Sequence, residues 1–267
     1  LKLHAPKPWR IPQLLAMALA TAAAPAEGRL KAPGKAELDQ AVQALLAEPT
    51  SSSCPDHCAA LEAATLRSST CHARLLEAGA ARGLVGAMRA HAEDPELQAT
   101  ALRALQHLSA AATANGARRC AEAGACSAAV AAMEAHPGHV LVQQAACHAL
   151  ELIAFGSPES RARAVAEGAV ESSSRVLKVH KSCATAQHAA LAALQAMSDD
   201  GAECARRFTE SGGVASLVGT IAEHKEDAQV QYWGSFLIRS LSAHNADIRS
   251  EVARKCHWQG IELDLDG

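Results

Sequence analysis

The stretch Glu122-Ala123-Gly124-Ala125 decides the fold, because the chain repeats it at a nearly fixed step. The same turn stands as Glu77-Ala78-Gly79-Ala80, as Ala166-Glu167-Gly168-Ala169 and as Glu210-Ser211-Gly212-Gly213. The four glycines therefore lie 45, 44 and 44 residues apart. Self-similarity at this period predicts a helical solenoid and argues against an ordinary single-core enzyme.

Two further columns keep the step, namely Gln98, Gln143, Gln187, Gln231 and Leu105, Leu150, Leu194, Ile238. The copy at 114–156 shows the plan of one unit. It predicts a short helix over 117–123, a second over 126–136 and a long third over 140–154. Gly124 separates the first helix from the second, because glycine accepts the left-handed backbone conformation of a helix end. Apolar residues of the third helix recur at i, i+4, i+7, i+8 and i+11.

The same plan divides the whole chain. Full copies are expected at 69–110, 114–156, 158–199 and 202–243, with a degenerate copy at about 35–66. Residues 1–34 are interpreted as an N-terminal extension and capping helix, and 244–267 as a partial repeat or cap with an acidic tail. The apolar run 11–26 follows Lys7 and Arg10 and ends in small residues, so a targeting peptide is the alternative. The chain begins with Leu1, which fits processing or excision from a longer protein.

The amino-acid composition narrows the class of protein. Apolar residues make up 49% of the chain but aromatic ones only 3%, and alanine dominates, which suits closely packed helices. The net charge of −3 has its signs interspersed, which argues against nucleic acid as a partner. The run 11–26 is too short to span a membrane comfortably. Nine scattered cysteines, several at positions that are apolar in sister copies, favour a reducing intracellular compartment. The expected location is the cytoplasm, and a cilium or an organelle is the alternative.

The pattern resembles the armadillo repeat, whose long third helix begins V-Q-x-x-A-x-x-A-L-x-x-L. That motif stands here as Val142-Gln143, Ala146, Ala149-Leu150 and Ile153, and again as Val230-Gln231, Gly234, Ile238 and Leu241. The resemblance covers roughly residues 35–255. It implies an all-α, right-handed α-solenoid of armadillo-like three-helix repeats, within the ARM/HEAT superfold. HEAT repeats are the near alternative, and the glycine break between the first two helices favours armadillo.

The resemblance also implies a binding scaffold in which stacked third helices line a concave groove. Well-known peptide-binding members carry a ladder of Trp and Asn one helical turn apart along that groove. The Trp positions hold Arg103, His148, Ala192 and Phe236 here, and the Asn positions hold His107, Leu152, Ala196 and Ser240. The ladder is missing, so the resemblance does not extend to importin-like capture of basic peptides.

By register the groove presents a different set: Arg103, His107, Gln144, His148, Glu151, His188, Gln195, Tyr232, Phe236 and Arg239, with Trp233 beside them. Tyr, Trp and Arg are the residues that most often anchor interfaces. A hot spot is therefore expected at Tyr232, Trp233, Phe236 and Arg239. The alternative is that Trp233 and Phe236 fill core space where the array ends.

Two polar columns also repeat. His91, His136, His180 and His224 each end a second helix. Repeats stacked about 8–10 Å apart cannot share zinc ligands that must lie about 2.0–2.1 Å from the metal. We therefore expect these side chains to interact with exposed carbonyls at helix C-termini. Arg74, Arg119, Arg163 and Arg207 precede the turn glycines. One interpretation is a basic edge that binds an acidic partner surface. The alternative is that these arginines are solvated or form ion pairs with Glu77, Glu122, Glu167 and Glu210.

No motif for catalysis, phosphate binding or a cofactor is found, and a solenoid lacks the deep pocket that most chemistry needs. The best metal candidate is the group Cys54, His57, Cys58, Cys71 and His72, whose spacing is not a common zinc form. The sequence thus predicts no enzyme and no cofactor. It predicts a scaffold that binds a partner protein or an extended segment along its groove. The alternative is a permanent structural subunit of a large ciliary, cytoskeletal or organellar assembly.

Overall fold

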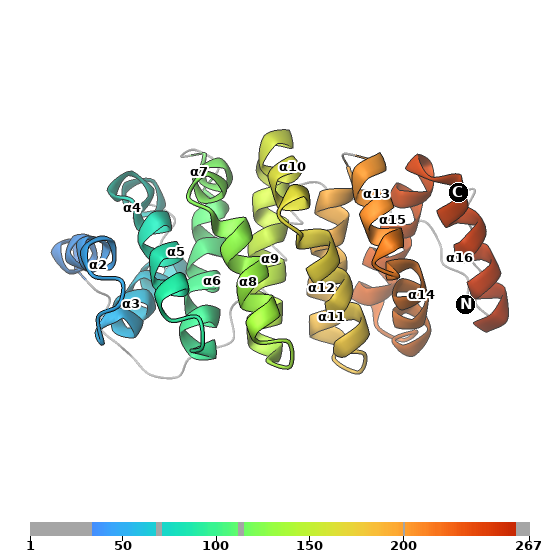
Figure 1. Ribbon diagram of the computed structural model, residues 1–267, viewed down its shortest axis with the longest axis horizontal. Coiled ribbons are helices and arrows are strands. Elements are labelled where there is room, and N and C mark those ends of the chain that lie inside the picture. The colour runs from blue at the N-terminus through green and yellow to red at the C-terminus, as the bar shows by residue number, and fades with distance from the viewer. Residues whose placement is uncertain (1–33, 68–70, 112–114, 200, 260–267) are drawn as a thin grey trace.

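The computed structural model describes residues 34–67, 71–111, 115–199 and 201–259, and within these ranges the regular structure is entirely helical (Figure 1). The expected cap in residues 1–33 and the acidic tail in 260–267 lie outside the described residues. Two helices come first, four triplets follow, and one helix ends the array. Their bounds are α2 Lys35–Ala47 and α3 Cys54–Arg67; α4 His72–Ala78, α5 Ala80–Ala90 and α6 Pro95–Ser109; α7 Gly116–Glu122, α8 Ala125–Ala135 and α9 Val140–Gly156; α10 Pro158–Ala166, α11 Ala169–Val179 and α12 Ala184–Ser198; α13 Ala202–Glu210, α14 Gly213–Glu223 and α15 Ala228–His244; and α16 Ala246–Gln259.

The turn glycine divides the first helix of each triplet from the second, as predicted. Its φ angle is 95° at Gly79, 88° at Gly124, 91° at Gly168 and 73° at Gly212. Residues with a side chain rarely adopt this left-handed backbone, because Cβ then crowds the following carbonyl. A Cβ on Gly124 would also lie 2.9 Å from the Arg89 guanidinium of the preceding triplet. The repeated glycine therefore fixes where one helix stops and the next starts.

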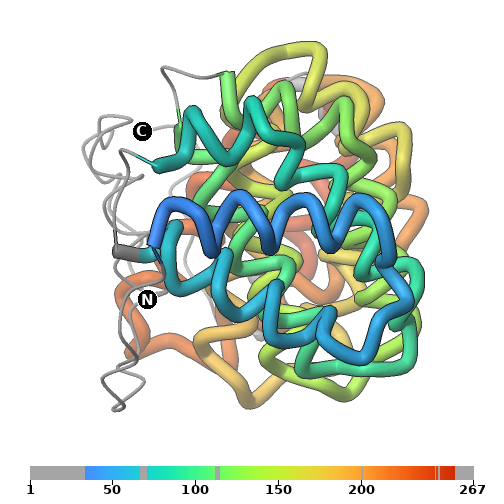
Figure 2. Tube along the Cα trace, turned by 90° about the vertical axis from the view of Figure 1, so that its left-hand side faces the viewer, coloured from blue at the N-terminus to red at the C-terminus, as the bar shows by residue number. Residues whose placement is uncertain are grey.

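Third helices stack on one another along the array. Helices α3, α6, α9, α12 and α15 follow as neighbours, and the second helices α5, α8, α11 and α14 lie in front of them in Figure 1. Figure 2 looks from the α2 end and shows the later repeats lying behind α2 and α3. The column Leu105, Leu150, Leu194, Ile238 is at most 1% exposed. The approach of α15 to α14 in the same repeat needs a small residue, since a Cβ on Gly234 would lie 2.8 Å from Ile221 Cγ1.

The glutamine column joins the third helix of each repeat to its second. Gln143 Nε2 donates to the carbonyl oxygens of Met133 and His136, each at 2.9 Å. The same pair of bonds runs from Gln98 to Met88 and His91, and from Gln231 to Ile221 and His224. Gln187 donates to the His180 carbonyl at 2.8 Å. The last carbonyls of a helix lack partners within it, so a buried amide that reaches them fixes the angle between two helices.

The histidine column joins one repeat to the next. His91, His136, His180 and His224 place Nε2 at 3.0, 2.7, 2.8 and 2.6 Å from the carbonyl oxygens of Pro49, Ala92, Pro137 and Lys181. Each of these carbonyls lies two residues beyond the second helix of the preceding repeat, or beyond α2 in the case of Pro49. A carbonyl only accepts hydrogen bonds, so Nε2 carries the proton. The predicted interaction with exposed helix-end carbonyls is confirmed, and it links neighbouring repeats.

None of the described helices is both long enough and apolar enough to cross a membrane.

Candidate partner-binding groove

Every predicted groove residue lies on α6, α9, α12 or α15, which are successive neighbours in the stack. Residues spaced i, i+4, i+7 and i+8 share one side of a helix. We call the resulting surface the third-helix face. It consists of Arg103 and His107 on α6; Gln144, His148, Glu151 and Leu152 on α9; His188, Ala192, Gln195 and Ala196 on α12; and Tyr232, Trp233, Phe236 and Arg239 on α15.

Rings form a continuous chain across three of these helices. The ring centroids of His148 and His188 lie 6.2 Å apart, and those of His188 and Trp233 also lie 6.2 Å apart. Tyr232 meets Trp233 edge-to-face at 5.2 Å and stacks on Phe236 at 6.3 Å. Such pairs contribute roughly 0.5–1.5 kcal/mol beyond the area they bury. The structure thus brings together five of the predicted residues in one row.

The chain of rings has a buried part and an accessible part. Trp233 is 3% exposed and belongs to the hydrophobic core. This burial agrees with the alternative in which Trp233 fills core space. Tyr232 and Phe236 are half-buried and pack against that core from its surface. A ligand on the third-helix face would therefore meet Tyr232 and Phe236, while Trp233 supports them from below.

The histidines of the face are in a dry environment. Burial lowers the pKa of His188 to about 4, and the nearby His148 lowers it further while Asp227 opposes the change. Burial also lowers the pKa of His107 to about 4, with added effects from His72 and Arg103. Both imidazoles are neutral at pH 7. The face therefore offers uncharged hydrogen-bonding rings at these positions.

Charged residues of the face are paired within the protein. Arg103 on α6 makes a two-pronged ion pair with Glu62 on α3, with Nε to Oε1 at 2.5 Å and Nη2 to Oε2 at 3.2 Å. Glu151 is 2% exposed and contacts His148, Oε2 to Nδ1 at 3.2 Å. The Arg103 pair joins α6 to α3, whereas the Glu151 contact lies within α9 and directs that buried carboxylate at His148.

The centre of the face, on α12, is the feature that sequence reasoning missed. Every residue from 186 to 198 is buried, including Ala192 at 1%, Ala196 at 0% and Gln195 at 2% exposed. The Gln195 oxygen Oε1 is buried without a hydrogen-bond partner. The signal was present in the sequence, since both ladder positions of this repeat hold alanine. These two alanines form a buried floor of methyl groups, which we call the alanine floor, beside one unsatisfied amide oxygen.

The arginine column lies on the first helices and mostly connects repeats. Arg74 Nη1 binds Asp39 of α2 at 2.8 Å, and Arg163 Nη1 donates to the Ala121 carbonyl of α7 at 2.8 Å. Arg207 Nη1 binds Glu171 of α11 at 3.0 Å. Arg119 is half-buried. Three of the four therefore hold the preceding repeat or helix, and a basic edge for a partner stays a prediction.

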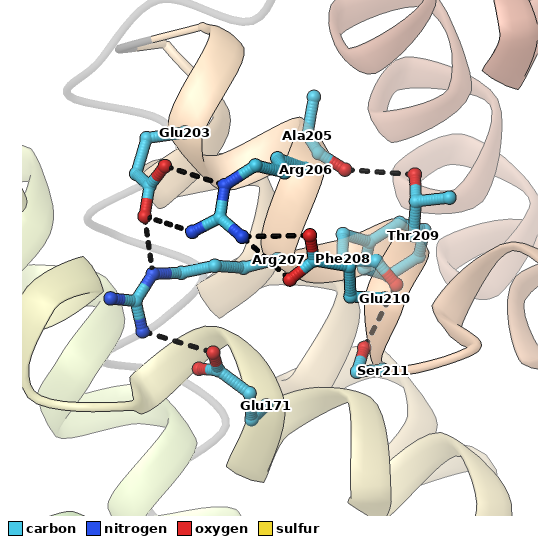
Figure 3. Close-up of polar contacts among 9 residues, drawn as sticks. All are labelled: Glu171, Glu203, Ala205, Arg206, Arg207, Phe208, Thr209, Glu210 and Ser211. Atoms are coloured by element: carbon cyan, nitrogen blue, oxygen red, sulfur yellow. Dashed lines mark hydrogen bonds and ion pairs between the residues drawn. The ribbon is translucent and has the colours of Figure 1, made fainter.

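Ion pairs around α13 differ from the predicted pairing in the last copy (Figure 3). The prediction paired Arg207 with Glu210, but Glu210 binds Arg206 at 2.6 Å. Arg207 instead binds Glu203, one helical turn before it, and Glu171 of the neighbouring repeat. Hydrogen bonds from Arg206 and Arg207 lower the pKa of Glu203 to about 2. Spacing along one helix did not reveal that the preceding repeat supplies a carboxylate.

Four of the five candidate metal ligands are hydrogen-bonded elsewhere or buried, and His57 is half-buried. His72 Nε2 lies 2.9 Å from the Thr65 carbonyl, and Cys71 donates to the Ala64 carbonyl at 3.5 Å. Cys54 and Cys58 are buried one turn apart on α3, and burial raises the pKa of the Cys58 thiol. Within the described ranges no cluster of three or more His, Cys, Asp or Glu residues has a metal-binding arrangement.

Comparison with known proteins gives the fold a name. No protein-family model and no curated protein sequence matches the chain. Among solved structures, a designed armadillo repeat protein in complex with the peptide (KR)4 superposes with a TM-score of 0.68 at 20% identity, covering 82% of this chain and 87% of that one. Computationally designed armadillo repeat proteins for modular peptide recognition give 0.67 at 22% identity, covering 82% and 88%. An engineered protein gives 0.67 at 23% identity, covering 82% and 86%.

These likenesses establish an armadillo-like repeat fold, as the sequence resemblance implied.

Proposed function

We propose that the chain is a non-catalytic scaffold that binds a partner protein or an extended segment of one along its third-helix face. The observation that carries the proposal is the row of rings from His148 to Phe236 beside the alanine floor of α12. Aromatic anchors around a desolvated centre are the usual make-up of an interface hot spot. Structural neighbours include a designed armadillo protein that holds a peptide, which supports this use of the fold.

The chemistry of the face favours an uncharged, apolar ligand segment. Glu151 is buried against His148, and Arg103 is held by Glu62, so a basic peptide would find few free counter-charges. Tyr232 and Phe236 are half-buried and offer apolar ring surface to such a segment, whereas Ala192 and Ala196 are buried and support the face from within. Specificity would then come from the shape of the ring surface, unlike a ladder that reads many charges.

An enzymatic role has little support on this face. Its histidines at 107 and 188 are buried and neutral at pH 7, so they offer no charged acid at that pH. The net charge of −3 also gives no electrostatic basis for binding nucleic acid.

Selection from a random peptide library tests the proposal. The full chain is used as bait, and each selected peptide is re-tested against Phe236→Arg, which places a charge at the half-buried edge of the face. The matched control is Val179→Arg, since Val179 is 51% exposed at the end of α11 and lies outside the third-helix face. Apolar peptides that lose binding to Phe236→Arg and keep binding to Val179→Arg support the proposal. Peptides that bind both variants equally would contradict it.

The alternative is a permanent subunit of a larger assembly. Its support comes from the sequence, since the Trp and Asn ladder of peptide-binding members is missing and the helices are rich in alanine. Light scattering of the purified full chain separates the two functions. A soluble monomer supports the scaffold, whereas precipitation that only co-expressed partners relieve supports the subunit.

A further inference from the structure

A cavity of about 230 Å³ lies between the second helices α5 and α8, which stand side by side in Figure 1. Met88 and Ala132 form part of its wall and are each 3% exposed. Ala92, Ala131 and Ala135 also line it and are exposed, so the cavity opens to solvent. An apolar cavity of about 150 Å³ can hold benzene, so this one has room for a molecule of one ring.

The cavity exists because α8 carries alanine where the next second helix, α11, carries longer side chains. Four alanines of α8 line it, namely Ala128, Ala131, Ala132 and Ala135. Counted from the turn glycine, the same positions of α11 hold Ser172, Arg175, Val176 and Val179. At the interface between α8 and α11, Arg175 Nη2 lies 3.7 Å from Glu134 Oε1. Alanine at all four positions leaves the space between α5 and α8 unfilled.

One buried amide supplies the polar part of the lining. Gln98 lines the cavity and is 2% exposed. Its Nε2 donates to the carbonyl oxygens of Met88 at 2.8 Å and His91 at 2.9 Å. Carbonyls only accept, so these two bonds fix the orientation of the amide, and no donor within the described ranges reaches its other atom, Oε1. A buried acceptor without a donor is uncommon, and here it lies beside empty space.

A sister repeat shows which group satisfies this oxygen. Gln187 is the equivalent glutamine two repeats on, and its Oε1 accepts a hydrogen bond from Thr220 Oγ1 of α14 at 2.6 Å. Counted from the turn glycines, Ala132 of α8 holds the position of Thr220. Alanine has no hydroxyl, so the interface between α5 and α8 lacks the donor that α14 supplies to Gln187.

We propose that this cavity binds a small molecule with an apolar body of one ring and a single hydroxyl group, of the phenol class. The hydroxyl donates to Gln98 Oε1, and the ring lies against Met88 and the alanine methyl groups. Arg89 also lines the cavity, and a guanidinium is attracted to the face of an aromatic ring, which favours a phenol over an aliphatic alcohol. This goes beyond the proposed function, because the site lies between second helices and not on the third-helix face.

Titration of the full chain with phenol tests the site, followed by NMR of ¹³C-labelled methionine methyl groups. Met88 lines the cavity, whereas Met197 is buried in α12 and serves as the internal control. We expect a saturable shift of the Met88 methyl signal and none at Met197. Toluene has the same ring without the hydroxyl, and its Kd should be at least about threefold higher. A Met88 signal that phenol does not move, or equal Kd values for phenol and toluene, would overturn the proposal.

Two variants fill the cavity in different ways. Ala131→Leu adds an apolar side chain from an exposed position of the lining, and its matched control is Glu134→Leu, exposed on the same helix but outside the lining. Ala132→Thr copies Thr220 and supplies the chain's own hydroxyl to Gln98. Circular dichroism first shows that each variant is folded. Ala131→Leu and Ala132→Thr should each raise the Kd for phenol at least about tenfold, and Glu134→Leu should leave it unchanged. Filled variants that bind phenol as tightly as the original chain would overturn the proposal.

The two proposals fail separately, because they use different surfaces. Phe236→Arg should abolish peptide binding and leave the phenol titration of Met88 unchanged. If peptides bind but phenol does not, the cavity proposal is wrong and the scaffold stands. If phenol binds but no peptide depends on Phe236, the scaffold is wrong and the cavity site stands.

Discussion

His180 Nε2 lies 2.8 Å from the carbonyl oxygen of Pro137, so the end of α11 is hydrogen-bonded to the end of α8 in the preceding repeat. The same bond recurs from His136 to Ala92 and from His224 to Lys181. Stacking in this array is thus held by a polar contact repeated at every step, in addition to the apolar core. A solenoid's stability is a sum of repeat and interface terms, so each such bond acts at one interface.

Loss of one histidine link should weaken one interface. We expect His180→Ala to lower the free energy of unfolding by about 1–2 kcal/mol, because the buried ring no longer satisfies the Pro137 carbonyl. Urea denaturation followed by circular dichroism measures this. His57→Ala on α3, where the ring is half-buried and lies outside the column, is the control and should cost less. An equal decrease in the free energy of unfolding for the two variants would show that the His180 hydrogen bond does not stabilise the interface.

The glutamine column should matter more than its neighbours on the same helix. Gln143→Ala leaves the carbonyls of Met133 and His136 without this donor and should destabilise the chain by about 1–3 kcal/mol. Gln144→Ala is the matched control, since Gln144 lies one residue on and makes an exposed bond to Thr185. Thermal melts of both variants compare the two. A Gln144→Ala variant that melts lower than Gln143→Ala would contradict the assignment.

Gly124 should not tolerate a branched side chain. Gly124→Val places a β-branched residue at a φ of 88°, which should cost at least about 1–2 kcal/mol of stability. Gly138→Ala is the control, because a Cβ there meets no atom within 4 Å. The melting temperature reports both. An unchanged melting temperature for Gly124→Val would mean that the turn has been assigned to the wrong residue.

Acid should destabilise the fold through the buried histidines. The pKa of His188 is about 4 in the folded chain, below its ordinary value of 6.5, so the unfolded chain binds the proton more readily. Stability from this residue is complete above pH about 6.5 and falls as pH drops towards 4. Urea midpoints measured across that window should decline, and His188→Gln should flatten the decline. An identical pH slope in His188→Gln would show that other groups dominate.

Much of the architecture was predictable because it depends on local backbone chemistry. The regular spacing of the turn glycines predicted that Gly124 ends a helix. The long helix of the copy at 114–156 was expected over 140–154 and spans Val140–Gly156. The purpose of Gln143 was not predictable, since its partners are carbonyls ten and seven residues earlier that only the fold brings near. Arg207 likewise finds Glu171 across a repeat boundary. Helical register predicted that Tyr232 and Phe236 share one face. The burial of the alanine floor on α12 could not be predicted, because it depends on how neighbouring helices pack around it.

The most direct test of the central claim is the affinity of a selected apolar peptide for the full chain and its variants, measured by titration calorimetry. Phe236→Arg should weaken binding at least about tenfold, a loss of about 1.4 kcal/mol, while Val179→Arg should leave the Kd unchanged. Equal Kd values for the original chain and both variants would contradict the claim that the third-helix face binds the ligand.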